Sequence, residues 1–303
     1  MTWSPDDLPS LDGRTAVVTG ANSGIGAVTA LELARHGASV TLACRDVESG
    51  EKAAARIRDA GGVDVRVEKL DLSALKSVEE FAERWQGPLD LLVNNAGVMT
   101  PPRYKETADG FELQFGTNHL GHFALTGRLL PALVAADRPR VVTVSSIAHF
   151  RGKADVLDGN PRERYRPEPA YANSKLANVL FAFELQRRSA AHGTALTSTA
   201  AHPGVSATGL VTSTQGMGSI PGVRLLAPPF LKLMFQSAAA GANPTLYAAT
   251  AAEPASYTGP QSLRETRGKV GPAKLNRLAR DEALAAKLWD RSEQLTGVIY
   301  PWR

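Results

Sequence analysis

Tyr171 and Lys175 are four residues apart in the segment Tyr-Ala-Asn-Ser-Lys. On a helix, this spacing places both side chains on one face, one turn apart. An ammonium group beside a phenol favours the phenolate, so the pair predicts a pKa for Tyr171 below the usual value of about 10. Such a tyrosine can exchange a proton with an alcohol or a carbonyl oxygen. The same spacing also occurs by chance on solvated helix faces, so the rest of the chain has to decide between the two interpretations.

A glycine-rich segment near the N-terminus has the composition of a phosphate-binding turn. It follows an apolar run at residues 14–19, which predicts a strand, and precedes a run of helix formers at residues 27–36. Glycine lets the backbone turn sharply and approach a pyrophosphate, to which the helix N-terminus offers free N–H groups. The spacing differs from the commoner Gly-x-Gly-x-x-Gly, but the strand–turn–helix context is the same. We therefore predict nucleotide binding by Gly20, Asn22, Ser23, Gly24, Ile25 and Gly26.

The residues after the second predicted strand, residues 39–44, bear on the choice of nucleotide. A carboxylate at this strand tip would bind the ribose 2′-hydroxyl of NAD, whereas an arginine suits the 2′-phosphate of NADP. Here the strand ends at Cys44, and Arg45 and Asp46 follow. Asp46 is better explained as the cap of the next helix. Arg45 therefore favours NADP over NAD, with an ordinary surface arginine as the alternative.

Further polar residues follow the third and fourth predicted strands, residues 63–70 and 89–93. Strand ends at the carboxyl edge of a parallel sheet line the ligand crevice. The alternatives are that Asp71 caps the next helix, for which Ser73 is also a candidate cap, and that the Asn-Gly segment is a plain turn. We predict cofactor contacts from Asp71, Leu72, Asn94, Asn95, Ala96 and Gly97.

The whole chain shows strands and helices in alternation. Further strands are predicted at residues 140–145, 194–201 and 261–266, and further helices at residues 46–60, 73–85, 111–136, 170–191, 237–252 and 273–296. This order predicts an α/β fold with a doubly wound parallel sheet of about seven strands and helices on both faces. We expect one domain over residues 1–303, with residues 1–13 as an N-terminal extension.

Composition excludes several classes of partner. Hydrophobic residues make up 43% and charged residues 21% of the chain, as in ordinary soluble globular proteins. The net charge of +4 comes without a basic run, so we expect no nucleic acid partner. With no signal-peptide pattern and no apolar run of about 18 residues, we expect a cytoplasmic protein without integral membrane association. Cys44 is the only cysteine, and the scattered histidines, including His119 and His122, predict packing roles and no metal.

The motifs together resemble the short-chain dehydrogenase/reductase family. TGANSGIG, NNAG, TNHLGHF, Ser145-Ser146, the Tyr171/Lys175 pair and His202-Pro203-Gly204 occur in the family's order over roughly residues 14–210. The resemblance implies a single-domain, Rossmann-like sheet. It also implies an enzyme that moves a hydride between a nicotinamide cofactor and a carbonyl group or its alcohol.

The resemblance implies a role for individual residues. Tyr171 matches the general acid/base, and Lys175 matches the lysine that lowers its pKa and holds the nicotinamide ribose. Ser146 matches the residue that hydrogen-bonds the substrate oxygen. Asn118 matches the helix asparagine that supports a water-linked proton relay to the lysine. The segment that touches the nicotinamide end is matched by Pro203, Gly204, Val205 and Thr208.

The interval between Ser146 and Tyr171 narrows the resemblance further. It spans 25 residues and leads into AYANSKLANVLF, which is similar to the retinol dehydrogenase-like branch and its bacterial relatives, as is KLWDRSEQLTG near the C-terminus. We therefore expect an NADP-dependent oxidoreductase for a lipophilic carbonyl compound or a primary or secondary alcohol. The alternative is a non-catalytic NADP(H)-binding sensor or scaffold, although such relatives usually lose the tyrosine or the lysine.

Residues 205–235 are rich in glycine, proline and large apolar side chains. The family places its substrate lid here, and an apolar lid suits a lipophilic substrate. A dimer contact, a shallow membrane contact and ordinary core are the alternatives. The resemblance also implies assembly as a homo-dimer or homo-tetramer.

Overall fold

Short strands rich in valine, leucine and alanine form the centre of the molecule. The computed structural model describes residues 3–205 and 236–302, and in this part of the chain one sheet contains eight strands. They are β1 (Thr15–Thr19), β2 (Ser39–Cys44), β3 (Val65–Lys69), β4 (Leu91–Asn94), β5 (Arg140–Val144), β6 (Thr197–Ala201), β7 (Tyr257–Ser262) and β8 (Arg267–Pro272).

The strand order is β3-β2-β1-β4-β5-β6-β7-β8. Every neighbouring pair is parallel except β7 and β8, which pair antiparallel as a hairpin. The chain moves outward from β1 to β3 and then crosses to β4 on the other side of β1. A sheet of this kind has a topological switch point between β1 and β4, where the crevice for a ligand opens.

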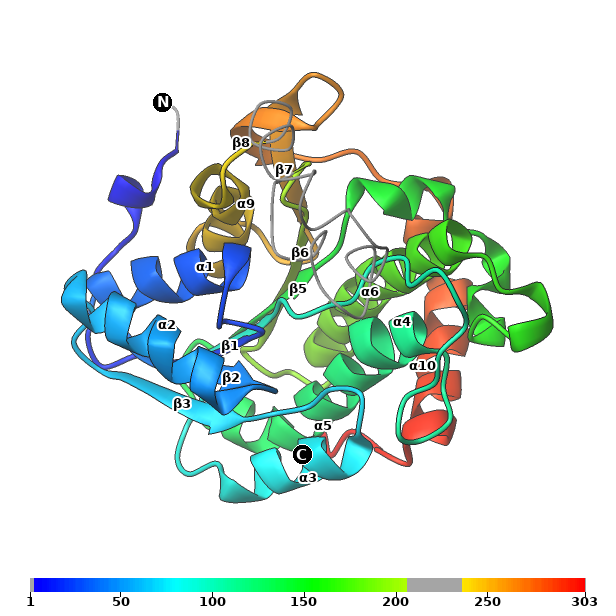
Figure 1. Cartoon of the computed structure of the whole chain (residues 1–303), viewed down its shortest axis with the longest axis horizontal. Coiled ribbons are helices and arrows are strands. Elements are labelled where there is room, and N and C mark those ends of the chain that lie inside the picture. The colour runs from blue at the N-terminus through cyan, green and yellow to red at the C-terminus, as the bar shows by residue number, and fades with distance from the viewer. Residues whose placement is uncertain (1–2, 206–235, 303) are drawn as a thin grey trace.

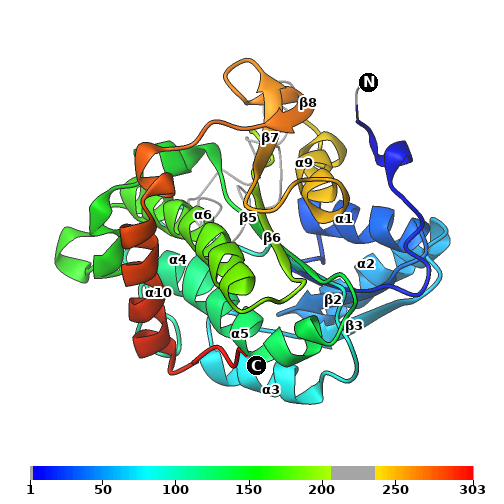
Figure 2. The ribbon, with the colours of Figure 1, turned by 180° about the vertical axis from the view of Figure 1, so that it is seen from behind.

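Helices cover both faces of the sheet (Figures 1 and 2). The longer helices are α1 (Gly24–Arg35), α2 (Val47–Asp59), α3 (Leu75–Arg84), α5 (Gly121–Val134), α6 (Pro167–Ala191), α9 (Ala238–Thr250) and α10 (Glu282–Thr296). Shorter helical segments are η1 (Pro5–Asp7), α4 (Leu113–Phe115), η2 (Gly116–Leu120), η3 (Ile147–Arg151), η4 (Ala154–Asp158), η5 (Arg162–Arg164) and η7 (Arg277–Arg280).

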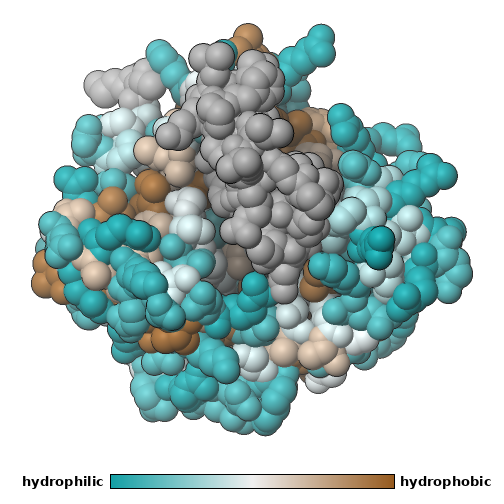
Figure 3. All heavy atoms as spheres, in the orientation of Figure 1, coloured by the Kyte–Doolittle hydropathy of each residue, from teal (hydrophilic) through white to brown (hydrophobic). Residues whose placement is uncertain are grey.

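Successive residues of β1 enter different cores, because side chains alternate across a strand. Val18 belongs to the core under α1, α2 and α9, where Leu33 and Leu246 also lie. Val17 belongs to the core on the opposite face, with Phe123 of α5 and Trp289 of α10. Outside the grey atoms, the face seen in Figure 3 is mostly hydrophilic, with apolar residues in scattered groups. The sheet is therefore buried on both sides, as the continuous apolar character of its strands predicts.

The predicted fold class is confirmed, and the first six predicted strands are all present. The seventh was misplaced: residues 261–262 end β7, residues 263–266 turn the chain between β7 and β8, and the sheet has eight strands. The sequences YTGPQS and RGKVGP contain glycine and proline, which have low strand propensity, so propensity does not predict these two strands. An antiparallel hairpin at the sheet edge nevertheless tolerates both residues.

The predicted helix at residues 111–136 is composite. α4 continues into the π-helical turn η2 and then into α5, and the Gly121 N–H donates to the Gly116 carbonyl oxygen, five residues back. Such a turn marks many functional sites, and here it carries Asn118. Among residues 3–205 and 236–302, no helix has both the length and the apolar character needed to span a bilayer. Thr208 and almost all of the predicted lid at 205–235 lie outside the described residues.

Candidate active site

A cleft of about 830 Å³ opens at the carboxyl ends of the parallel strands. Its wall takes residues from the segments that follow β1, β2, β3, β4, β5 and β6, among them Gly20, Arg45, Ser146 and Pro203. In doubly wound sheets this edge is where ligands bind. The cleft therefore gathers residues that are far apart in the sequence.

The glycine segment is fitted closely to its neighbours. Gly20 has a φ of +65°, a conformation that side chains disfavour. A Cβ on Gly26 would lie 2.5 Å from Asn95 Nδ2 and 2.6 Å from the Gly20 carbonyl oxygen. Asn95 Nδ2 is itself held at 2.7 Å by the Thr19 carbonyl oxygen. Because glycine has no side chain, the backbone N–H groups at the start of α1 can be approached closely, and this arrangement accepts a pyrophosphate.

The tip of β2 places Arg45 in the cleft wall, where it is exposed. Asp46 Oδ1 accepts a hydrogen bond from the Ser49 N–H at 3.2 Å, and Asp46 Oδ2 accepts one from Ser49 Oγ at 2.7 Å. The predicted cap of α2 is therefore confirmed. These bonds lower the pKa of Asp46. Cys44 is buried beneath them, and burial raises the pKa of its thiol to about 11.

The tip of β3 contributes Asp71 and Leu72 to the wall. Asp71 Oδ1 accepts hydrogen bonds from Ser73 N at 2.9 Å and from Ser73 Oγ at 2.6 Å. The cap position of α3 is Ala74, and the Leu75 N–H donates to Asp109 Oδ2 at 2.9 Å. Both predicted caps, Ser73 and Asp71, were wrong, because a carboxylate from a distant loop binds this helix end.

The segment after β4 lies partly in the wall and partly behind it. Asn95, Ala96 and Gly97 line the cleft, whereas Asn94 is fully buried and donates from Nδ2 to Thr126 Oγ1 at 3.0 Å. Asn94 therefore supports the wall from behind, and its side chain does not reach the cleft.

Asn118 is also fully buried, and it does not line the cleft. Its Oδ1 accepts from the Val98 N–H at 2.8 Å, and its Nδ2 donates to the Val98 carbonyl oxygen and to Ser174 Oγ, both at 3.0 Å. Asn118 thus ties the segment after β4 to α6. The predicted role in a proton relay stays a prediction.

Ser146, Tyr171 and Lys175 come together in the cleft wall. Ser146 follows β5, and the other two lie on α6 with the ammonium nitrogen 5.8 Å from the centre of the Tyr171 ring. Lys175 Nζ donates to the Val144 carbonyl oxygen at 3.1 Å, and Ser145 Oγ donates to the Lys175 carbonyl oxygen at 2.7 Å. These bonds fasten α6 to the end of β5, so the three side chains share one surface.

Burial dominates the electrostatics of the pair. Tyr171 is 8% exposed and Lys175 only 3%. Burial raises the pKa of Tyr171 to about 12, although the Ser146 side chain opposes the rise through a hydrogen bond. Burial also lowers the pKa of Lys175 to about 8. The predicted fall in the Tyr171 pKa is therefore wrong for the protein alone, because the loss of water around the buried phenol raises its pKa more than the Ser146 hydrogen bond lowers it.

The two neighbouring histidines are buried and hydrogen bonded, as predicted. His122 Nε2 lies 2.9 Å from Thr19 Oγ1, and its Nδ1 lies 3.0 Å from the Asn118 carbonyl oxygen. His119 Nε2 lies 2.9 Å from Ser292 Oγ. Burial lowers the pKa of His119 to about 3 and that of His122 to about 4, so both rings are neutral at physiological pH.

The cleft wall also includes residues that the sequence interpretation missed. Met99, Phe150 and Arg151 line the cleft, and so does Thr266 from the β7–β8 turn. Phe150 and Arg151 follow Ser146 within five residues, so their nearness in sequence was a usable signal. No sequence signal places Thr266 in the cleft, because the β7–β8 hairpin is not evident from the sequence.

Comparison with known proteins gives a consistent picture. Residues 14–217 match the family model described as short chain dehydrogenase. Retinol dehydrogenase 13 of Mus musculus is 43% identical over 296 residues, which cover 95% of this chain and 85% of that protein. Polyprenol dehydrogenase of Mus musculus is 44% identical over 304 residues, which cover 97% and 87%. A crystal structure of an uncharacterized protein from Mycobacterium paratuberculosis is 47% identical, covers 99% of this chain and 100% of its own, and superposes with a TM-score of 0.83.

Proposed function

The chain belongs to the short-chain dehydrogenase family and is an NAD(P)-dependent oxidoreductase acting on CH–OH groups, and from this premise we propose that it uses NADP(H) on a lipophilic alcohol or carbonyl compound. The observation that carries the proposal is the shared cleft. It joins a bare glycine turn and an arginine at the β2 tip to the Ser146, Tyr171 and Lys175 cluster.

The residues of the cleft fit a dinucleotide. Gly20, Ser23 and Gly24 line the cleft at the start of α1, where backbone N–H groups and the helix dipole favour a phosphate. The nicotinamide, when bound, supplies or accepts the hydride. Ser146 would hold the substrate oxygen, and Tyr171 would give or take its proton. Lys175 would stabilise the phenolate as it forms, and Asn94 and Asn118 would act through the wall they support.

The proposed preference for NADP rests on Arg45. A guanidinium group binds a phosphate monoester with two parallel hydrogen bonds, and Arg45 lies in the wall directly after β2. The carboxylate of the next residue, Asp46, is bound to the first turn of α2.

Arg45→Ala is expected to lower the ratio of kcat/KM for NADPH over NADH by about tenfold or more, since a charge-assisted phosphate contact is lost. Initial rates with both cofactors at one fixed substrate concentration measure the ratio. Arg56→Ala, at an exposed position of α2, is the matched control and should leave the ratio unchanged. A wild-type preference for NADH, or an unchanged ratio in Arg45→Ala, would reject the assignment.

The proposed lipophilic substrate is supported by the apolar side chains in the wall. Val98, Met99, Ile147 and Phe150 line the cleft that also contains Ser146 and Tyr171, and Phe150 remains 41% exposed. Pockets lined mainly by apolar and aromatic side chains with a few polar groups bind apolar ligands. The retinol and polyprenol named for the two mouse relatives are alcohols of this kind.

A homologous series of straight-chain aldehydes tests this point, with retinal as a further substrate. We expect kcat/KM to rise roughly two- to fourfold for each added methylene over the first several members, because burial of one methylene contributes about 0.8 kcal/mol. The loss of reduced-nicotinamide absorbance gives the rates. Phe150→Gln should flatten the series without changing the affinity for NADPH. A series that is flat or falling in the wild type would contradict the proposal.

A further inference from the structure

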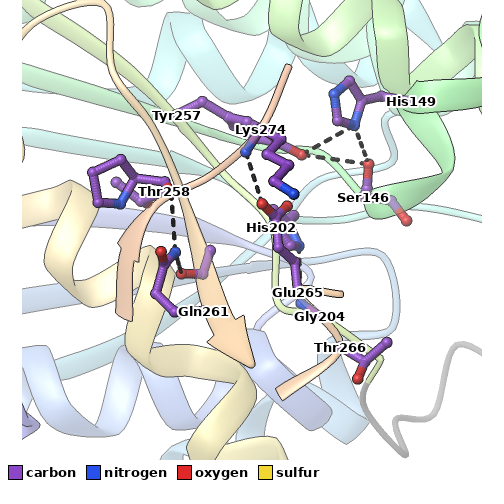
Figure 4. Close-up of polar contacts among 12 residues, drawn as sticks. Ser146, His149, His202, Gly204, Tyr257, Thr258, Gln261, Glu265, Thr266 and Lys274 are labelled. Carbon is purple, nitrogen blue, oxygen red and sulfur yellow. Dashed lines mark hydrogen bonds and ion pairs between the residues drawn. The ribbon is translucent and has the colours of Figure 1, made fainter. Parts of the chain in front are cut away.

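A buried acid–histidine pair lies beside the cleft, outside the reacting groups. His202, directly after β6, is fully buried, and the Glu265 side chain, in the turn between β7 and β8, is 10% exposed. His202 Nε2 and Glu265 Oε2 are 3.4 Å apart, and the two side chains overlap in the view of Figure 4. Ionisable groups are seldom buried like this unless they are paired, so the contact calls for an explanation.

The partners of each group define how the pair is arranged. The Gly204 N–H donates to His202 Nδ1 at 3.1 Å, so the neutral ring carries its proton on Nε2, the nitrogen that faces Glu265. The second carboxylate oxygen, Glu265 Oε1, accepts from the Lys274 N–H at 2.9 Å. A Cβ on Gly259 of β7 would overlap the His202 ring, so the ring packs directly on the hairpin backbone. Nδ1 of the ring and Oε1 of the carboxylate are hydrogen bonded, whereas Nε2 and Oε2 are buried with no hydrogen-bond partner and only the 3.4 Å contact between them.

The turn that carries Glu265 is conformationally costly. Leu263, Arg264 and Glu265 have φ values of 48°, 56° and 65°, which places three successive non-glycine residues in the left-handed region. Such residues persist only where surrounding contacts hold them, and they cluster at functional sites. The buried carboxylate is the contact that anchors this turn to the interior.

The same turn holds one wall of the cleft. The Val205 N–H donates to the Thr266 carbonyl oxygen at 2.9 Å, and the Gln236 N–H donates to the Val205 carbonyl oxygen at 3.1 Å. Pro203, Gly204, Val205 and Thr266 all line the cleft. The backbone of 203–205 is therefore fixed on one side by the His202 ring and on the other by the residue next to Glu265.

We propose that Glu265 is a positioning residue that, through His202 and the β7–β8 turn, fixes the segment Pro203–Val205 against the nicotinamide half of the cofactor. Glu265 does not line the cleft, so its effect is transmitted through the two backbone hydrogen bonds at Gly204 and Val205. The proposal rests on the proposed function in one respect, which is that Pro203–Val205 borders the nicotinamide end of the cleft.

Glu265→Gln tests the proposal with little change in shape. Glutamine removes the negative charge that faces His202 Nε2 and has one acceptor oxygen, so it cannot both accept from the Lys274 N–H and present an oxygen to His202. We expect the Kd of the complete dinucleotide to rise roughly tenfold. The Kd of the same nucleotide without nicotinamide, 2′-phospho-ADP-ribose or ADP-ribose, should not change. Calorimetric titration of the full chain gives both constants.

Two further variants separate positioning from general loss of structure. Lys269→Gln, on the exposed edge of the same hairpin, should change neither Kd. His202→Phe should weaken binding of the complete dinucleotide as Glu265→Gln does, and the double variant should be no weaker than the worse single variant, because both residues act through one contact. If the losses of binding free energy in the two single variants added up in the double variant, His202 and Glu265 would not act through one contact.

The remaining outcomes are also decisive. If Glu265→Gln lost affinity equally for both nucleotides, or lost affinity for neither, the positioning role would be overturned. If the wild type itself binds the complete dinucleotide no more tightly than the shorter nucleotide, the assignment of Pro203–Val205 to the nicotinamide end fails, and the present proposal fails with it. If the wild type binds the complete dinucleotide more tightly than the shorter nucleotide, and Glu265→Gln does so by the same factor, only the proposed role of Glu265 is rejected.

Discussion

Tyr171→Phe is expected to lower kcat by about a hundredfold or more, because a positioned general acid or base contributes 10²–10⁴-fold. Phenylalanine keeps the ring in its buried place and removes only the hydroxyl that the Ser146 side chain contacts. The affinity for the dinucleotide should stay within about twofold, since the turn at Gly20–Gly26 is untouched. Steady-state rates on the best aldehyde and calorimetric titration with the cofactor measure the two effects.

Tyr165→Phe is the matched control for this substitution. Tyr165 is a half-buried tyrosine whose hydroxyl donates to the Pro101 carbonyl oxygen at 2.8 Å, and it does not line the cleft. Loss of this hydroxyl should lower the free energy of unfolding by about 1 kcal/mol, while kcat stays close to the wild-type value. If Tyr171→Phe turned over a good substrate at the wild-type rate, another group would have to supply the proton.

Lys175→Met is expected to lower kcat by an amount on the order of a hundredfold without lowering the free energy of unfolding. The ammonium group that stabilises the Tyr171 phenolate is lost, which accounts for the fall in rate. Methionine fills a similar volume. The Val144 carbonyl oxygen keeps a donor, because Asn178 Nδ2 also reaches it at 3.0 Å. Removal of the lysine therefore leaves no buried acceptor without a partner.

The stability difference should depend on pH in a defined direction. Burial lowers the pKa of Lys175 from 10.5 to about 8. Below pH 8 the lysine is charged in both states, and the folded state carries the full desolvation cost, on the order of 3 kcal/mol. Between about pH 8 and 10.5 the unfolded chain binds more protons, so wild-type stability rises with pH relative to Lys175→Met. Above that range both states are neutral and the cost is gone.

Urea unfolding of both proteins at about pH 7 and about pH 10 measures this difference. Lys153→Met, which replaces an exposed lysine, should show no comparable dependence on pH. A Lys175→Met protein that is less stable than the wild type by the same amount at both pH values would mean that the ammonium group is not penalised by burial.

The central sheet and most of the cleft could be predicted from the sequence because their signals are local. Strands such as SVTLAC are short apolar runs, and the glycine turn follows its strand within one residue. The carboxyl ends of parallel strands meet at one edge, so each strand tip could be placed in the cleft without knowledge of packing. Arg45, Asp71, Asn95 and Ser146 all lie there.

What could not be predicted depends on contacts between distant residues or on burial. The cap of α3 comes from Asp109, 34 residues after the helix start. Asn94 and Asn95 are adjacent and chemically identical, yet one faces Thr126 behind the wall and the other faces the cleft. The pKa of Tyr171 was mispredicted for the same reason, since a spacing of four residues shows which groups are neighbours but not how much water surrounds them.

The order of the strands has a consequence for how the protein reaches its working form. β4 pairs with β1 after a detour through β2 and β3, and near the C-terminus the Tyr300 hydroxyl donates to the Phe123 carbonyl oxygen, 177 residues earlier in the chain. Chains dominated by such non-local pairings fold slowly, because each contact closes a long loop. The cleft takes its walls from Gly20 through Thr266, so it is complete only after the last of these pairings has formed. Recovery of turnover during refolding would therefore report the end of assembly, after the recovery of helical signal.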